Sequence, residues 1–117
     1  MVVLGEVLRR LVGPYELLDL PDGGAARLRV RSYERGTMVI SPRYPGAPAE
    51  KEVEVLRVHV TPEVKPYPPH YWDITSKTLT AQLLPLLMER GFDLYEYVVT
   101  KHGVAPRARF TLERVPL

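Results

Sequence analysis

The sequence predicts an α+β domain of 117 residues in which β-structure predominates. Several segments alternate apolar and polar residues, which is typical of strands with one buried face. Two other segments repeat apolar residues every three or four positions, which is typical of helices packed on a core. The length suits one domain with one hydrophobic core, and no internal repeat or domain boundary is visible, so residues 1–117 are interpreted as a single domain.

Two helices are predicted. From Met1 to Val12 the apolar residues form one stripe of helical spacing. From Thr75 to Arg90 leucines repeat in the same way, with Asp73 or Thr75 as the N-cap. Pro85 lies inside this second pattern, and a proline in a helix interior costs about 3 kcal/mol. We therefore expect a kink there, or two short helices of which Pro85 opens the second.

Six strands are predicted from period-2 patterns and from the turn residues between them. They cover Tyr15–Leu20, Ala26–Glu34, Thr37–Ser41, Glu52–Thr61, Asp93–Lys101 and Arg107–Val115. Residues 21–24 would turn the first strand into the second as a hairpin, and Arg35-Gly36 would turn the second into the third. The proline-rich stretch 61–73 is expected to be extended and stiff.

From residue 25 onward the order of elements is three strands, one helix and two strands. This order resembles that of the OB-fold, a Greek-key barrel with its helix between the third and fourth strands. It is similar to that of the small OB-fold proteins of archaea and phages that bind single-stranded nucleic acid. The resemblance rests on order and length, not on a diagnostic motif. It implies a five- to six-stranded antiparallel barrel in residues 25–115, to which residues 1–24 add a helix and a strand. An open antiparallel sheet packed against two helices fits the same pattern.

Composition narrows the class of protein. No apolar run reaches the roughly 18 residues that a membrane-spanning helix needs, and the charged N-terminal stretch does not resemble a secretory signal, so a cytoplasmic protein without a membrane partner is expected. Cysteine and asparagine are absent, there are 12 prolines, and arginine supplies 12 of the 16 cationic residues. This avoidance of heat-labile side chains predicts a thermophilic, archaeal source.

One strand carries the best functional candidate. Arg27, Arg29, Arg31 and Tyr33 alternate with apolar residues and would share one strand face. Their spacing of about 7 Å is close to that of phosphates along a nucleic-acid strand. The alternative interpretation is a solvated face that pairs with acidic residues across the sheet, such as Glu52 and Glu54.

Nearby aromatic residues favour nucleic-acid binding, because bases stack on flat side chains beside basic groups. The basic last hairpin adds a second possible contact region. The candidate nucleic-acid-binding residues are Arg27, Arg29, Arg31, Tyr33, Arg43, Tyr44, Arg57, Tyr67, Lys101, Arg107 and Arg109. Tyr95 and Tyr97 are instead expected to point into the core, and Trp72 to cap one end of it.

No catalytic signature is recognisable. His59, His70 and His102 form no tight metal-ligand motif, and no acid/base pair can be nominated. We therefore expect no enzyme activity, no cofactor and no metal. The first functional hypothesis is a module that binds single-stranded DNA or RNA. The second is a protein-interaction or homo-oligomeric module, which would use the N-terminal helix or an edge strand.

Overall fold

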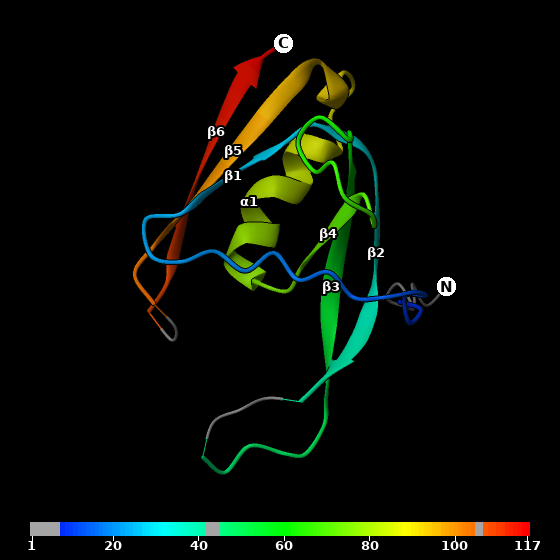
Figure 1. Cartoon of the computed structure of the whole chain (residues 1–117), viewed down its shortest axis with the longest axis vertical. Helices are drawn as coiled ribbons and strands as arrows, with labels where there is room; N and C mark the ends of the chain where they lie inside the picture. The colour runs from blue at the N-terminus through cyan, green and yellow to red at the C-terminus, as the bar shows by residue number, and fades with distance from the viewer. Residues whose placement is uncertain (1–7, 42–44, 105–106) are drawn as a thin grey trace, which may run out of the picture.

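The computed structural model describes residues 8–41, 45–104 and 107–117, which form two three-stranded antiparallel sheets and one α-helix (Figure 1). The elements are β1 (Ala25–Leu28), β2 (Val30–Ile40), β3 (Lys51–Val60), β4 (Tyr71–Ile74), α1 (Lys77–Leu87), η1 (Phe92–Leu94), β5 (Tyr95–His102) and β6 (Arg109–Pro116). One sheet has the order β2-β3-β4 and the other β1-β5-β6. Because no pairing joins β4 to β6 within the described residues, the sheets do not close, and the predicted barrel with two helices is wrong.

A bend at Arg29 distributes one stretch of chain between the two sheets. The predicted strand Ala26–Glu34 is divided into β1, which pairs with β5, and the first half of β2, which pairs with β3. The register of β2 is irregular between Val30 and Ser32, so the side-chain alternation is interrupted at this point. The predicted turn at Arg35-Gly36 is also wrong, because β2 continues to Ile40.

The core lies where α1 packs against the inner faces of the two sheets. Its buried members are Leu28, Val30, Leu56, Val58, Val60, Ile74, Leu79, Leu83, Leu87, Tyr97 and Val99. The buried leucines of α1 recur every four residues, and in β5 the core residues Tyr97 and Val99 are two apart, as the two periodicities require. Tyr97 is fully buried and Tyr95 packs against the core, so the inward orientation predicted for both is confirmed. Trp72, predicted to cap the core, is half-buried against it.

The helix differs in detail from the prediction. Its N-cap is Ser76, whose Oγ accepts a hydrogen bond from the backbone N–H of Leu79 at 3.2 Å, and not Asp73 or Thr75. Pro85 lies inside one helix, so of the two expected outcomes the pair of short helices is wrong. Because proline has no backbone N–H, the carbonyl of Ala81, four residues before Pro85, has no helical donor. Ala81 and Pro85 are both exposed, so water can bond to this carbonyl.

The described part of the N-terminal stretch is extended, so the predicted helix is wrong for residues 8–12; residues 1–7 lie outside the described residues. Residues 8–18, here termed the crossing segment, run across the outer face of the β2-β3-β4 sheet. Isolated parallel bridges join Arg10 to Thr37 and Leu17 to Asp73. The predicted strand Tyr15–Leu20 thus makes one bridge with β4 in place of a hairpin with the next strand.

The proline-rich stretch 61–73 is not uniformly extended. Residues 62–64 form a turn, and β4 begins at Tyr71. Within the described residues, no helix combines the length and apolar character that crossing a bilayer requires.

Candidate nucleic-acid interface

The arginine stripe predicted on one strand face is divided by the bend at Arg29. Arg27 and Arg29 both donate to the carboxylate of Glu96 on β5, with Nε–O distances of 2.5 Å and 2.8 Å. Arg29 also forms an ion pair with Glu63, in which its Nη1 lies 2.5 Å from the carboxylate oxygen Oε2. The acidic partners expected for the stripe, Glu52 and Glu54, are not these carboxylates, because the register of β3 places both opposite the far half of β2.

Glu96 is the centre of this network. Its side chain is only 7% exposed, because the two guanidinium groups cover it on the outer face of the sheet. Hydrogen bonds from Arg27 and then Arg29 outweigh the effect of burial and lower the pKa of the Glu96 carboxyl. The stripe therefore has a structural role at these two positions, although the side chain of Arg27 remains 64% exposed.

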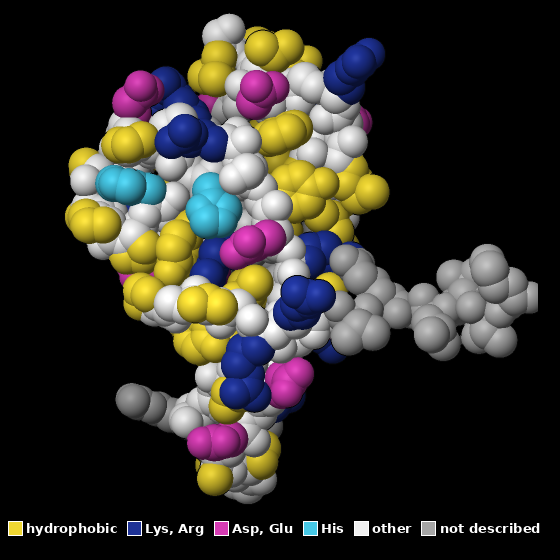
Figure 2. Space-filling view, turned by 90° about the vertical axis from the view of Figure 1, so that its right-hand side faces the viewer, with side chains coloured by type: hydrophobic (Ala, Val, Ile, Leu, Met, Phe, Trp, Pro, Cys, Tyr) yellow, Lys and Arg dark blue, Asp and Glu magenta, His cyan; other side chains and the backbone are white. Residues whose placement is uncertain are grey.

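Arg31 and Tyr33 lie on β2, in the other sheet. Arg31 is exposed and borders a hollow with Ser32, His59 and His70. Figure 2, which views the molecule from the side of β2, shows histidines among interspersed basic and acidic side chains, so this face carries no field of a single sign. Tyr33 is half-buried and meets Phe92 edge-to-face at 6.2 Å between ring centroids, so its ring belongs to the core and is not free for base stacking.

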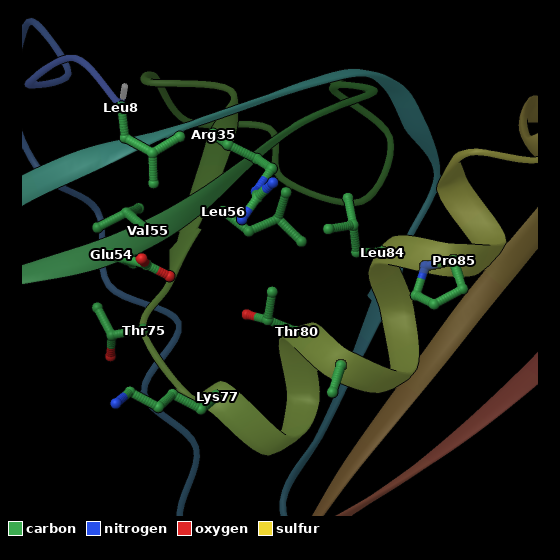
Figure 3. Close-up of a pocket in the computed structure, with 11 residues that line it drawn as sticks. Leu8, Arg35, Glu54, Val55, Leu56, Thr75, Lys77, Thr80, Leu84 and Pro85 are labelled. Carbon is green, nitrogen blue, oxygen red and sulfur yellow. The ribbon is translucent and has the colours of Figure 1, made fainter. Parts of the chain in front are cut away.

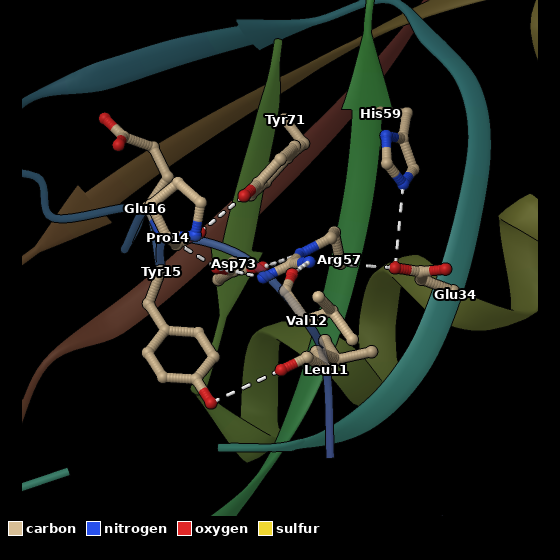
Figure 4. Close-up of polar contacts among 10 residues, drawn as sticks. All are labelled: Leu11, Val12, Pro14, Tyr15, Glu16, Glu34, Arg57, His59, Tyr71 and Asp73. Atoms are coloured by element: carbon tan, nitrogen blue, oxygen red, sulfur yellow. Dashed lines mark hydrogen bonds and ion pairs between the residues drawn. The ribbon is translucent and has the colours of Figure 1, made fainter. Parts of the chain in front are cut away.

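Arg57 is buried beneath the crossing segment and pairs with Asp73 (Figure 4). Its Nε and second terminal nitrogen lie 2.7 Å and 3.2 Å from the two carboxylate oxygens, and its other terminal nitrogen donates to the carbonyl of Val12 at 2.6 Å. Burial opposes the charge of Arg57, but the hydrogen bond and charge of Asp73 prevail and raise the pKa of the guanidinium. Arg57 is therefore a structural residue without access to a nucleic acid.

The surroundings of this pair complete a polar cluster between sheet and crossing segment. The guanidinium carbon of Arg57 lies 4.1 Å from the ring centroid of Tyr71, whose hydroxyl donates to the carbonyl of Pro14. Burial raises the pKa of the Tyr71 hydroxyl. Glu34 lies 3.8 Å from both Arg57 and His59. Arg57, Asp73 and Tyr71 each form a hydrogen bond with the crossing segment, so the cluster holds this segment on the sheet.

The remaining candidates gather at the β1-β5-β6 sheet. Because Tyr97 and Val99 face the core, the alternate residues of β5 and their cross-strand neighbours face outward. We term this surface the open sheet face; it comprises Arg27 on β1, Val98, Thr100 and His102 on β5, and Arg109, Thr111 and Glu113 on β6. His102 Nε2 and Thr111 Oγ1 are 3.0 Å apart.

Arg109 is exposed at one end of the open sheet face, and the exposed Arg107 precedes it in the β5–β6 loop. Lys101 alternates to the opposite side of β5 and is half-buried. Tyr67 lies in the loop before β4, exposed, with the ammonium of Lys65 4.2 Å from its ring centroid. Arg43 and Tyr44 lie outside the described residues. Arg27 and Arg109 thus lie on the same sheet face, and Arg107 lies in the adjoining loop. The other candidates with described positions, Arg31, Tyr33, Arg57 and Tyr67, lie outside this sheet.

The sequence interpretation missed the acidic partners. Asp73 is the buried ion-pair partner of Arg57. The carboxylate of Glu96 accepts hydrogen bonds from Arg27 and Arg29. For Glu96 a signal existed, since an acidic residue between two inward tyrosines must lie on the outer face of the sheet, but pairing it with β1 requires the sheet order. No group of three or more potential metal ligands occurs within the described ranges. No protein-family model, curated protein or solved structure matches the chain.

Proposed function

We propose that the chain is a nucleic-acid-binding module without catalytic activity, and that the open sheet face together with Arg107 is its contact surface for single-stranded DNA or RNA. The observation that supports this proposal is the position of Arg27, Arg107 and Arg109 on one exposed sheet and its adjoining loop. Thr100 and Thr111 lie between the arginines and offer hydroxyl groups to phosphate oxygens.

The balance of charge on this surface favours an anionic partner. Glu96 is already neutralised by two arginines, which leaves Glu113 as the acidic residue of the open sheet face. The one ring on this face, the imidazole of His102, lies within hydrogen-bond distance of Thr111, and none of the described residues on the face is Phe, Tyr or Trp. Contacts would therefore go to phosphates and not to stacked bases, which predicts binding with little sequence preference and a marked dependence on salt.

Exchanging both Arg107 and Arg109 for glutamate should abolish measurable binding of a fluorescein-labelled (dT)20 oligonucleotide at 50 mM salt. For the unaltered chain, two phosphate contacts, from Arg107 and Arg109, predict a fall in affinity of about sevenfold between 50 and 200 mM salt, since Arg27 is already paired with Glu96. Fluorescence anisotropy measures both quantities. The matched control is Arg9→Glu, an exposed arginine on the crossing segment, which should bind almost as tightly as the unaltered chain. Equal losses in both variants, or binding that salt does not weaken, would contradict the proposal.

A second candidate function, self-association, is favoured by the edge of β6. The backbone groups of Lys101 bond to the β1 side of β5, so the opposite residue, Phe110, points its own backbone groups away from β5. Gln82 donates to the Phe110 carbonyl at 3.1 Å. Further along the same edge, the backbone groups of Leu112 and Arg114 have no partner within the described residues. Such an edge is a template for another strand.

An antiparallel pair of β6 strands centred on Leu112 would place Arg109 opposite Val115 of a second copy and would bring no like charges face to face. Val115 is exposed, so its replacement leaves the core intact. Val115→Lys should weaken the dimer about threefold or more, and Val115→Glu should strengthen it, because the new charge meets Arg109 twice across the two-fold axis. Sedimentation at several concentrations measures the dimer dissociation constant. A monomer at all concentrations, or equal effects of the two substitutions, would exclude this pairing.

A further inference from the structure

Two cavities border the inner and outer sides of the β2-β3-β4 sheet. The first, between α1 and the β2–β3 hairpin, is lined mainly by apolar groups (Figure 3). The second, here termed the histidine hollow, has a volume of about 420 Å³ and is bordered by Arg31, Ser32, His59, Val60 and His70. This volume is within the roughly 300–1,000 Å³ of small-molecule sites. The histidine hollow shares no residue with the open sheet face, so whatever binds there is independent of the proposed nucleic-acid contact.

The irregular register of β2 brings two consecutive side chains to the histidine hollow. Between the cross-strand pairs Val30–Val60 and Ser32–His59, β2 advances by two residues and β3 by only one, which is the pattern of a β-bulge. Val30 is buried in the core, whereas Arg31 and Ser32 are both exposed. Both therefore lie on the outer face, where a regular strand would place only one of them.

The register of the sheet brings the two histidines beside this pair. His59 lies directly opposite Ser32. It faces outward, because Val58 and Val60 on either side of it are buried. His70 precedes β4, and its carbonyl accepts the backbone N–H of Val60 at 3.0 Å. The four polar side chains thus come from adjacent positions on three neighbouring segments and border one hollow.

These side chains have polar groups available to a ligand. The guanidinium of Arg31 and the hydroxyl of Ser32 make no hydrogen bond or ion pair with another described residue. Nδ1 of His70 donates to the carbonyl of Lys65 at 2.8 Å, which fixes the ring and leaves its Nε2 for a ligand.

The charges around the histidine hollow favour an anion. No carboxylate borders it among the described residues, and Arg31 supplies a cation. Arg31 also borders a neighbouring hollow that contains Glu63 and Asp93, but neither carboxylate lies within ion-pair distance of its guanidinium. Glu34 lies 3.8 Å from Nε2 of His59, and Nδ1 of the same ring lies farther from this carboxylate (Figure 4).

We propose that the histidine hollow binds a phosphate group, either as the free ion or as the monoester of a small molecule. The guanidinium of Arg31 donates to one or two of the phosphate oxygens. The hydroxyl of Ser32 and the imidazole nitrogens form hydrogen bonds with the others. A tetrahedral phosphate has oxygens for groups that approach from three segments, whereas a planar carboxylate has only two.

Proton NMR of the histidine rings tests this site, because two of the three histidines border the hollow and His102 lies on the open sheet face. Titration with inorganic phosphate at pH 7 and constant ionic strength should shift the Cε1–H signals of His59 and His70 together, with one dissociation constant. Acetate should bind about tenfold more weakly, because it has two oxygens and a smaller charge. Shifts confined to His102, or equal affinities for phosphate and acetate, would overturn the proposal.

Ribose 5-phosphate distinguishes the two sources of the phosphate group. Tighter binding than that of inorganic phosphate would identify the ligand as a monoester whose organic part also fits the hollow, and equal or weaker binding would identify it as the free ion. Both results support the phosphate site. Ribose, which lacks the phosphate, should shift neither signal, and affinities of ribose and ribose 5-phosphate that agree would contradict the assignment.

Two substitutions with opposite effects separate loss of binding from loss of folding. Arg31→Gln keeps an exposed polar side chain and should weaken phosphate binding about tenfold. Glu34→Gln should tighten it about threefold, because it removes the negative charge beside His59. The matched control is Arg90→Gln, an exposed arginine beyond the end of α1, which should leave the affinity unchanged. Equal losses in Arg31→Gln and Arg90→Gln would mean that phosphate responds only to the total charge of the chain, and the proposal would fail.

Discussion

Replacing Asp73 by alanine should lower the free energy of unfolding by about 3–5 kcal/mol, because it leaves a buried arginine without its partner. Asp73 and Arg57 are only 1% and 3% exposed, so neither charge regains water when the other is removed. The same carboxylate accepts the backbone N–H of Glu16 at 2.8 Å, and this contact to the crossing segment is lost as well. Glu34, half-exposed and 3.8 Å away, compensates only weakly.

Urea unfolding followed by the fluorescence of Trp72, which neighbours Asp73 in β4, measures the effect. The matched control is Asp19→Ala, an exposed aspartate in the stretch leading to β1, which should change stability by less than about 0.5 kcal/mol. The double variant Arg57→Met/Asp73→Leu should lower the free energy of unfolding less than Asp73→Ala alone, because it leaves no unpaired buried charge. A loss below about 1 kcal/mol for Asp73→Ala would mean that water reaches Arg57, contrary to the burial of the pair.

Regular elements near the core could be predicted from the sequence. β3, β5, β6 and α1 lie within a few residues of their predicted ranges, because apolar residues recur in each of them with a clear period. Val58 and Val60 in β3 show the period of two, and Leu79 and Leu83 in α1 that of the helix. These patterns are local, so neighbouring residues alone reveal them.

The crossing segment could not be predicted in this way. Its leucines have helical spacing, but residues 8–12 are extended because β2 offers them backbone partners: the Leu11 N–H donates to the Thr37 carbonyl, and the Thr37 N–H to the Arg9 carbonyl, both at 2.9 Å. Arg57 adds its bond to Val12, 45 positions away. Contacts between residues so distant in sequence leave no trace in the local pattern, and they override helix propensity.

The candidate site was predictable only in part. The period-2 alternation predicted Arg27, Arg29 and Arg31 on one face, and in a straight strand the three side chains would share that face. The bend at Arg29 transfers Arg31 to the other sheet, and the partner of Arg27 and Arg29 is Glu96, 69 and 67 positions away. Which arginines remain available to a ligand therefore depends on strand order, which side-chain alternation does not encode.

Introducing a single methyl group at Gly36 should detach the crossing segment from β2 at a cost of about 2 kcal/mol. A Cβ atom at Gly36 would lie 2.5 Å from the carbonyl oxygen of Arg9 and 2.5 Å from a methyl carbon of Leu11. The first of these atoms is backbone, so the segment itself must move. Its two hydrogen bonds with Thr37 are then lost, which outweighs the gain that alanine brings to a strand.

Hydrogen exchange measures this detachment directly, since the amides of Leu11 and Thr37 should lose protection in Gly36→Ala while those of β5 keep it. Ser32→Ala, an exposed position on the same strand, is the control and should leave both protection and stability nearly unchanged. Unaltered protection of Leu11 in Gly36→Ala would contradict the close packing of the segment on β2.

The two substitutions also test whether the crossing segment is held as one unit. Gly36 faces its first half, and Asp73 binds its second half through Glu16. If the segment leaves β2 in Gly36→Ala, Arg57 also loses its hydrogen bond to the Val12 carbonyl. Part of the stability that Asp73→Ala removes is then already lost. The double variant should therefore be less destabilised than the two single losses combined, by about 0.5 kcal/mol or more. Full additivity would mean that the two halves are anchored independently and that the buried ion pair keeps its surroundings when residues 9–12 detach.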